Sequence, residues 1–333
     1  MPDDQTRGIR DVDHVAFIGL GLIASSMCLA LRRAGFAGRI TGHARTEVTR
    51  VRAIELGLID EAHATAADAV EGAEIVVLCV PVGACGAVAS EIAGSLAEGA
   101  VVTDVGSVKA HVIEAVEPHL PAHARLAAGH PIAGTEKSGP DAGFSSLFDG
   151  RWSIITPSAR SDAASVALVR SLWEALGSRV EIMTPDHHDR VLAITSHLPH
   201  LIAFNMVNAA ADLGKVTNSD VIEFSAGGFR DFTRIAASDP IMWRDVFLNN
   251  KSATLEMLGR FSEELDALQQ AIRDGDGELL EARFAAARAV RASIIDAGQD
   301  IAADDFGRAL LATGAANRDD LSAPVPDAHE AGD

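Results

Sequence analysis

A short apolar stretch near the start of the chain, VAFIGL, is followed directly by a segment with the composition of a helix. Glycines stand at 19 and 21 and an alanine at 24, in the spacing G-x-G-x-x-A. After a strand, the first glycine permits a tight turn, and the second lets the backbone approach a pyrophosphate at the start of a helix. The turn therefore predicts a dinucleotide-binding domain of the Rossmann type. We expect five residues of the turn to contact the cofactor: Gly19, Leu20, Gly21, Leu22 and Ile23.

The rest of the chain falls into two regions of different pattern. From 14 to about 180, short Val- and Ile-rich runs alternate with Ala-rich segments, as strands alternate with crossover helices in a parallel sheet. Strand candidates are VAFIGL, RITGH, EIVVLCV, AVVTDV and RLAAGH, with others around WSIITP and RVEIM. From 187 to about 311 the pattern is almost entirely helical. We predict an α/β Rossmann-type N-terminal domain with a parallel sheet, followed by an all-α C-terminal domain.

The same patterns predict the domain limits. We expect an N-terminal extension over 1–13, the Rossmann domain over 14–185, a helical substrate and dimerisation domain over 186–311, and a disordered tail over 312–333. Segments 191–213 and 241–271 are apolar on more than one face, which is more than a small bundle buries by itself. This predicts a homodimer through the helical domain, and a solution mass equal to one chain would contradict it.

The balance of charge limits the partners. The 47 acidic side chains outnumber the 28 basic ones and give a net charge of −19, which disfavours nonspecific attraction to nucleic acid or anionic lipid. No apolar run approaches the roughly 20 residues that span a bilayer, and the first fourteen residues lack the features of a secretory signal. We expect a cytoplasmic protein with a small-molecule ligand and with neither nucleic acid nor membrane as a partner.

The end of the second predicted strand bears on the choice of cofactor. NAD-binding domains usually carry an Asp or Glu there, about 20 residues beyond the glycines, which bonds the ribose hydroxyls. This chain has Ala44, Arg45 and Thr46 instead. An arginine there can bind the 2′-phosphate of NADP, so we expect NADP to be accepted as well as NAD; a solvated Arg45 at a helix start is the open alternative. Further cofactor contacts are expected from Val80, Pro81 and Asp104.

Polar residues that packing alone does not explain gather in three places. DVGSVK (104–109) and GHPIAGTEKSGP (129–140) each follow a predicted strand, and ligands of an open parallel sheet bind beyond the carboxyl ends of its strands. Ser107 and His130 are therefore candidates for catalysis. The third set lies in the helical region, as SHLPH (196–200) and GGFRDFTRIAASDPIMW (227–243).

Together these motifs resemble the prephenate and arogenate dehydrogenases (cyclohexadienyl dehydrogenases) of tyrosine biosynthesis. The resemblance runs from about His14 to about Gly307 and includes, in order, LGLIxSS, DVxSVK, GHPIAGTEKSG, SHLPH and GFRDFTRIAxSDPxMW. It implies oxidative decarboxylation of a cyclohexadienol, with hydride transfer from C4 to NAD(P), loss of the C4 hydroxyl proton and expulsion of carbon dioxide. His130 matches the family's catalytic histidine, which accepts that proton, and Ser107 would share the hydrogen bond to the hydroxyl.

The resemblance also implies contacts with the substrate. Arg234 matches the arginine that binds a substrate carboxylate, a group that a planar guanidinium can bind in bidentate fashion. From the helical domain, His197 and His200 would contact the substrate and Trp243 would close the pocket. Thr135 and Glu136 would lie at its mouth, and Asp231 would orient Arg234 or a histidine.

Several residues have a plainer interpretation. His197 and His200 are three apart, like a metal pair, but no third ligand at a recognisable spacing accompanies them, and we expect no metal. His187 and His188 fit a solvated helix start. Lys109 and Lys137 fit surface charges as well as ligand contacts.

Two rival functions stay open. One is a β-hydroxyacid dehydrogenase, but that class uses a lysine on the first interdomain helix, whereas 186–200 contains histidines and no lysine. The other is a non-catalytic sensor of the nicotinamide redox state, which would need no general base beside the nicotinamide.

Overall fold

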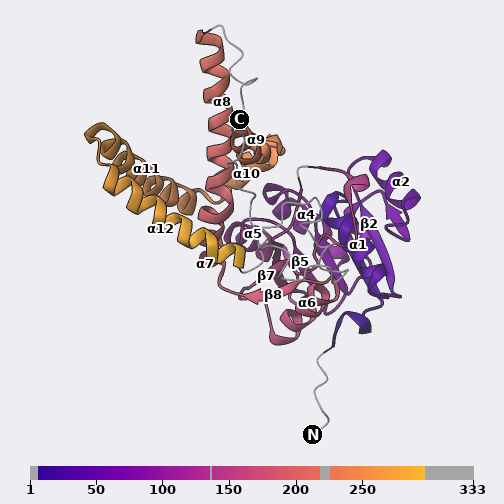
Figure 1. The fold of residues 1–333 in the computed structure, drawn as a ribbon. Coiled ribbons are helices and arrows are strands. Elements are labelled where there is room, and N and C mark those ends of the chain that lie inside the picture. The colour runs from indigo at the N-terminus through magenta and orange to yellow at the C-terminus, as the bar shows by residue number, and fades with distance from the viewer. Residues whose placement is uncertain (1–6, 136, 218–225, 297–333) are drawn as a thin grey trace, which may run out of the picture. The chain divides into compact units, whose positions relative to one another are not determined.

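The computed structural model describes residues 7–135, 137–217 and 226–296. Glu136 and the predicted tail over 312–333 lie outside the described residues. The chain divides into two compact units, 1–265 and 266–333. The first contains the strands and the helices up to α10, α11 extends across the division, and α12 belongs to the second (Figure 1).

Eight strands in the described part of the chain form one sheet in the order β3-β2-β1-β4-β5-β6-β7-β8. Neighbouring strands are parallel except β6 and β7, which are antiparallel. The predicted α/β class is confirmed, with two differences: the short strand β3 was not predicted, and the chain direction reverses between β6 and β7. The strands are β1 (His14–Ile18), β2 (Arg39–His43), β3 (Glu61–His63), β4 (Ile75–Leu78), β5 (Val101–Asp104), β6 (Arg125–Pro131), β7 (Trp152–Pro157) and β8 (Arg179–Ile182).

Helices fill most of the connections, and several begin at a side-chain cap. Thr46, Thr65 and Asp162 each accept the backbone N–H three residues later, which satisfies an amide that the first turn leaves unpaired. The helices of this region are α1 (Leu22–Arg33), α2 (Glu47–Glu55), α3 (Ala66–Ala69), α4 (Cys85–Ile92), α5 (Lys109–Val116) and α6 (Ala163–Ala175).

In its described part, the chain after β8 consists of helices joined by short connections and contains no strand, as predicted. It comprises α7 (Pro185–Leu192), the π-helical turn η6 (Ala193–His197), α8 (Leu198–Thr217), α9 (Gly227–Thr233), the 3-10 turn η7 (Arg234–Ala237), α10 (Pro240–Asn249), α11 (Lys251–Asp274) and α12 (Gly277–Asp296). None of the described helices has the length and apolar character needed to cross a membrane.

Helices α7 and α10 connect the first part of this helical region to the sheet. Helix α7 packs against α5 and strand β7, and α10 packs beside the 3-10 turn η2 (Val82–Ala84) that follows β4. Trp243 and Val246 of α10 join the apolar core that β1, β4 and β5 form with α3, α4 and α5. The residues of α7 and α10 are thereby held near the carboxyl ends of β4 to β6.

Candidate active site

The glycine turn joins β1 to α1 in a geometry that suits a pyrophosphate. Gly19 has a φ of +99°, and a Cβ there would lie 2.3 Å from the carbonyl oxygen of Cys79, so the position requires glycine. A Cβ on Gly21 would meet no atom within 4 Å, so the backbone is open on that side. Helix α1 has no side-chain cap and no acidic residue in its first turn, so its first amides suit an anion. Leu20 is buried below the turn, and Ile23 is half-buried.

The end of β2 carries arginines and no carboxylate. Ala44 is buried, whereas Arg45 and Thr46 are exposed at the start of α2. The Arg50 guanidinium, which the sequence did not single out, donates to the carbonyl oxygen of Ala44 at 2.7 Å. Two arginines therefore lie at the turn where an NAD-specific domain would carry a carboxylate.

His130 lies near the carboxyl end of β6, with only 8% of its surface exposed. Its Nδ1 is 2.8 Å from Nε2 of His188, and the two rings meet edge to face. Nδ1 of His188 is in turn 2.7 Å from Oδ1 of Asp189. Asp189 also accepts the backbone N–H groups of Lys109 and Ala110, at 2.7 and 3.0 Å. These contacts make a buried hydrogen-bonded row, His130–His188–Asp189, anchored at the start of α5.

Burial controls the charge of this row. It holds the pKa of His130 well below the usual value, with smaller contributions from the charges of His188, Lys109 and His197. Burial also lowers the pKa of His188, against the opposing effect of Asp189. Both imidazoles are therefore neutral near pH 7, and a neutral imidazole carries one donor and one acceptor nitrogen. His130 has the protonation state that a proton acceptor requires.

Lys109 and Asp104 form a buried ion pair behind His130. The Lys109 ammonium is fully buried and donates to the Asp104 carboxylate and, at 2.6 Å, to the carbonyl oxygen of Gly129. Asp104 also accepts the N–H groups of Gly106 at 2.8 Å and Gly129 at 3.0 Å. The ion pair therefore holds both the backbone N–H and the carbonyl oxygen of Gly129, the residue before His130.

This ion pair bears on two expectations. The interpretation of Lys109 as a surface charge is wrong, because the surrounding strands and helices enclose it; Lys137 is exposed. The carboxylate oxygens of Asp104 already accept protein donors, so the geometry supports a structural role for Asp104. Its predicted contact with the cofactor stays a prediction.

The helical region contributes a buried histidine from the π-helical turn, a feature often found at functional sites. His197 is fully buried, and its Nδ1 lies 3.1 Å from Nδ2 of Asn250, whose amide also donates to the carbonyl oxygen of Asp189 at 2.9 Å. Because Nδ1 accepts, the hydrogen is on Nε2. The ring lies within hydrogen-bonding reach of the backbone of Ser107, and Nε2 makes no other hydrogen bond among the described residues. Burial lowers the pKa of His197 to about 4, so His197 is a neutral donor.

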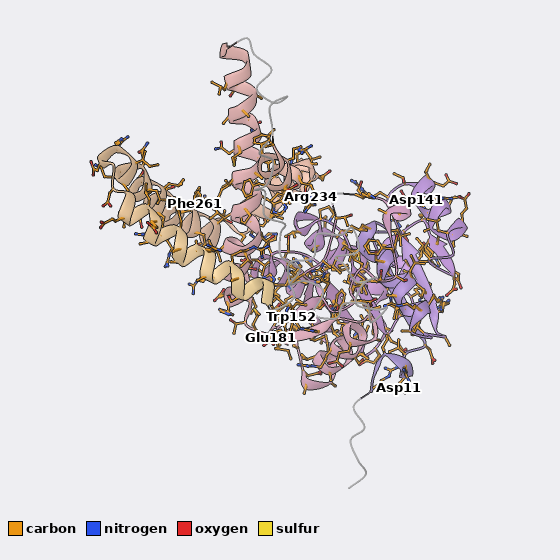
Figure 2. The ribbon with its side chains drawn as sticks, viewed as in Figure 1. Asp11, Asp141, Trp152, Glu181, Arg234 and Phe261 are labelled. Atoms are coloured by element: carbon orange, nitrogen blue, oxygen red, sulfur yellow. The ribbon has the colours of Figure 1, made fainter. Side chains whose placement is uncertain are left out.

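A second group gathers around Trp243. Its ring stacks on His200, with 3.7 Å between centroids and 23° between planes. Nδ1 of His200 donates to the carbonyl oxygen of Ser196 at 2.9 Å. The pKa of His200 is lowered by burial and, to a smaller extent, by the positive charge of Arg234, which begins η7. Arg234 itself is exposed and is labelled in Figure 2.

The remaining predicted residues are placed as follows. Ser107 is half-buried just after β5, and Thr135 is half-buried in the loop after β6. Asp231 is exposed on α9. Val80 is half-buried and Pro81 exposed after β4. Their predicted contacts with substrate or cofactor stay predictions.

The residues that support His130, namely His188 and Asp189, were not predicted as site residues from the sequence. His188 was expected in a solvated helix start, and this is wrong: His188 and Asp189 are buried, whereas Asp186 and His187 are exposed as expected. The helical period held a signal, because His188 and Asp189 lie four and three residues before Leu192, on the face that α7 buries. Asn250, at the end of α10, offered no comparable pattern.

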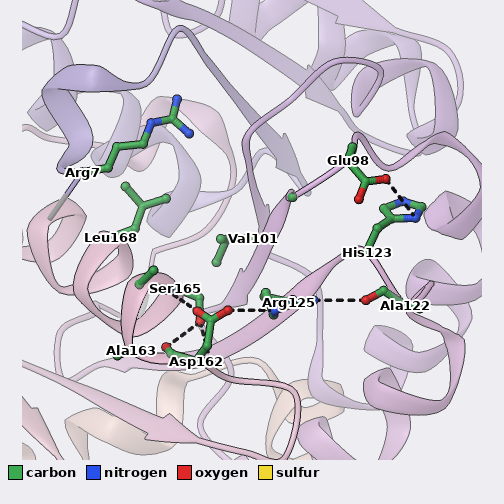
Figure 3. Close-up of a pocket in the computed structure, with 12 residues that line it drawn as sticks. Arg7, Glu98, Val101, Ala122, His123, Arg125, Asp162, Ala163, Ser165 and Leu168 are labelled. Carbon is green, nitrogen blue, oxygen red and sulfur yellow. Dashed lines mark hydrogen bonds and ion pairs between the residues drawn. The ribbon is translucent and has the colours of Figure 1, made fainter. Parts of the chain in front are cut away.

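A separate pocket of about 740 Å³ opens at the amino ends of β5 and β6 (Figure 3). Arg125 lines it at the first residue of β6, roughly 17 Å along the strand from His130 at about 3.3 Å per residue. Its Nε donates to Asp162, also on the pocket wall, at 2.8 Å. The pocket therefore lies at the edge of the sheet opposite the candidate site.

Within the described ranges, no three His, Cys, Asp or Glu side chains are arranged to hold a metal ion.

Two family models match the chain. "Prephenate dehydrogenase, nucleotide-binding domain" matches residues 27–182, and "Prephenate dehydrogenase, dimerization domain" matches residues 184–286. The first match begins after the glycine turn. The cofactor assignment of that turn therefore relies on its geometry and on relatives that match over more of the chain.

Such relatives include the cyclohexadienyl dehydrogenase of Zymomonas mobilis, which is 40% identical over 84% of this chain and 96% of its own length. The prephenate dehydrogenase of Bacillus subtilis is 33% identical over 84% of this chain and 75% of its own length. Among solved structures, Aquifex aeolicus prephenate dehydrogenase in complex with hydroxyphenyl propionate and NAD+ is 37% identical, with a TM-score of 0.79 over 85% of this chain and 98% of that one. The chain belongs to the prephenate dehydrogenase family of NAD(P)-dependent oxidoreductases.

Proposed function

We propose that this chain oxidises and decarboxylates prephenate, arogenate or both. The observation that best supports this is the neutral, buried His130 near the carboxyl end of β6, held at Nδ1 by His188. A nicotinamide dinucleotide at the Gly19–Gly21 turn supplies the hydride acceptor. His130 accepts the proton of the C4 hydroxyl, and the departure of carbon dioxide leaves an aromatic ring, so the protein has only to align two carbons and remove one proton.

The residues from the helical region suit the other parts of such a substrate. Prephenate carries two carboxylates, which a chain with a net charge of −19 must meet with local donors. The Arg234 guanidinium is suited to bind one carboxylate. The neutral His197 imidazole lies at the backbone of Ser107 and can hold that residue in place, and the stacked His200 and Trp243 rings offer a flat wall to the substrate.

We further propose that NADP is accepted alongside NAD. The support is the pair of arginines, Arg45 and Arg50, at the start of α2, together with the lack of a carboxylate at Ala44. A 2′-phosphate would find two cations and a helix N-terminus there, where a carboxylate would repel it.

One experiment tests both proposals. NADH and NADPH formation is measured at 340 nm with prephenate and with arogenate, each with either cofactor. We expect turnover with at least one substrate and measurable kcat/KM with both cofactors. Cofactor binding without turnover on either substrate would favour the redox sensor, and a large preference for NAD would contradict the role of Arg45.

The carboxylate contact of Arg234 predicts a specific kinetic change. In Arg234→Gln we expect KM for the substrate to rise roughly 10- to 100-fold, the value of a lost charge-assisted hydrogen bond, with kcat changed only slightly. The reason is that the contact is present in both the ground state and the transition state. Steady-state kinetics measure both constants.

Arg230→Gln is the matched control, since Arg230 lies four residues earlier, on α9, and is also exposed. Its KM should stay near the wild-type value. A fall in kcat at constant KM in Arg234→Gln would contradict the assignment.

We also propose that the chain forms a homodimer in the cytoplasm, through its helical region. The match to a dimerization-domain family supports the dimer. So do the large apolar side chains that the single chain leaves exposed there, among them Leu213, Leu248, Leu255, Phe284 and Val290.

A further inference from the structure

The hydrogen-bonded row behind His130 has a direction. We propose that His188 and Asp189 are positioning residues that keep the hydrogen of His130 on Nδ1 and thereby present Nε2 to the substrate as the proton acceptor. The inference rests on the proposed function. His188 and Asp189 would act by keeping His130 in one tautomer, and not by binding the substrate.

The direction of the row follows from its far end. An ionised carboxylate only accepts hydrogen bonds, so Nδ1 of His188, 2.7 Å from Asp189, must be the donor. Nε2 of the neutral His188 is then a lone pair, and His130 must donate to it from Nδ1 across 2.8 Å. The hydrogen of His130 is thereby committed to Nδ1, which leaves Nε2 as its acceptor atom.

The far end is itself fixed. The two carboxylate oxygens of Asp189 accept the N–H groups of Lys109 and Ala110, so the carboxylate cannot rotate away without leaving two amides of α5 unpaired. The other charged or titratable groups near His130 are engaged elsewhere: the Lys109 ammonium with Asp104, and Nδ1 of His197 with Asn250. Among the described residues, Nε2 of His188 is the atom that accepts a hydrogen bond from Nδ1 of His130.

The row also offsets a cost of burial. A buried imidazole resists becoming an imidazolium ion, yet His130 must take up a proton during the reaction. A carboxylate connected through one neutral imidazole favours the cation that forms, in the way that a third group orients and supports the base of a catalytic triad. His188 is therefore expected to affect kcat, with little effect on the binding of either ligand.

Two substitutions at one position isolate this contact. In His188→Gln, the carboxamide offers a carbonyl oxygen to His130 and an N–H to Asp189, as the neutral imidazole does. In His188→Asn, the shorter side chain places its amide where Nδ1 was, so it keeps Asp189 and cannot reach His130. We expect kcat to fall roughly 10- to 100-fold in the Asn variant and much less in the Gln variant, with substrate KM and cofactor Kd near wild type in both. His187→Asn and His187→Gln, at the exposed neighbour, are matched controls and should leave all constants unchanged.

A double-mutant cycle separates positioning from folding. If His188 acts through His130, then adding His188→Asn to His130→Asn should lower the residual kcat by less than about 2-fold. An equal loss in both backgrounds, or equal losses in the Gln and Asn variants, would overturn the inference. Wild-type protein without turnover on either substrate would instead overturn the proposed function, so the two failures are distinguishable.

Discussion

Replacing His130 with asparagine should lower kcat by about 10²- to 10⁴-fold, the range that general acid–base catalysis contributes. Asparagine is similar in size and keeps a polar group toward His188, but its amide does not accept a proton near neutral pH. The dissociation constant of the cofactor should stay near wild type, because the turn at Gly19 and Gly21 proposed for the pyrophosphate follows a different strand, β1. Steady-state kinetics with saturating NAD, together with a fluorescence titration of the cofactor, measure the two quantities.

The pH profile provides an independent check on the same residue. A base works in its unprotonated form, so kcat/KM should fall as the pH drops through the pKa of His130. Burial holds that pKa well below its usual value, so the acid limb should lie below about 6.5, the pKa of a free imidazole. The limb should be missing in His130→Asn and unchanged in His119→Asn, where the histidine is exposed. An acid limb that persists in His130→Asn would assign the titration to another group.

The sheet shows which parts of a fold sequence patterns can predict. The five strands named as runs could be recognised because most of their residues are buried: β1 and β4 to β6 almost throughout, and β2 over its three central residues. Strand β3 has three residues, Glu61–His63, none of them buried, so it has no apolar run to detect. The antiparallel pairing of β6 with β7 depends on the path of the intervening chain, and alternation of strand and helix does not encode that path.

The site shows a similar division. His130 and Ser107 stand in long motifs at strand ends, which is why the sequence identified them as candidates. Residues that support them from another element have no such mark: His188 meets His130 across 58 positions of sequence, and the charged pattern DHHD is typical of a solvated helix start. Long-range packing turns that helix so that two of the four residues of the motif, His188 and Asp189, are buried.

Lys109→Met should be the most destabilising of the substitutions considered. Methionine matches the length of the lysine but removes its charge, so the fully buried Asp104 would keep two backbone donors and lose its counter-ion. Breaking a buried ion pair on one side costs about 3–5 kcal/mol of unfolding free energy. Urea denaturation followed by far-UV circular dichroism measures the change. Because the pair also holds Gly129, kcat should fall as well.

Two further variants separate the loss of the ion pair from the loss of the lysine side chain. Lys137→Met removes an exposed lysine and should change stability by no more than about 0.5 kcal/mol. Adding Asp104→Asn to Lys109→Met removes the unpaired charge but turns an amide N–H toward one of two backbone donors, so a deficit of about 1–3 kcal/mol should remain. Lys109→Met as stable as Lys137→Met would mean that Asp104 finds a proton or a water in place of the ammonium, and that the peptide before His130 is held by other contacts.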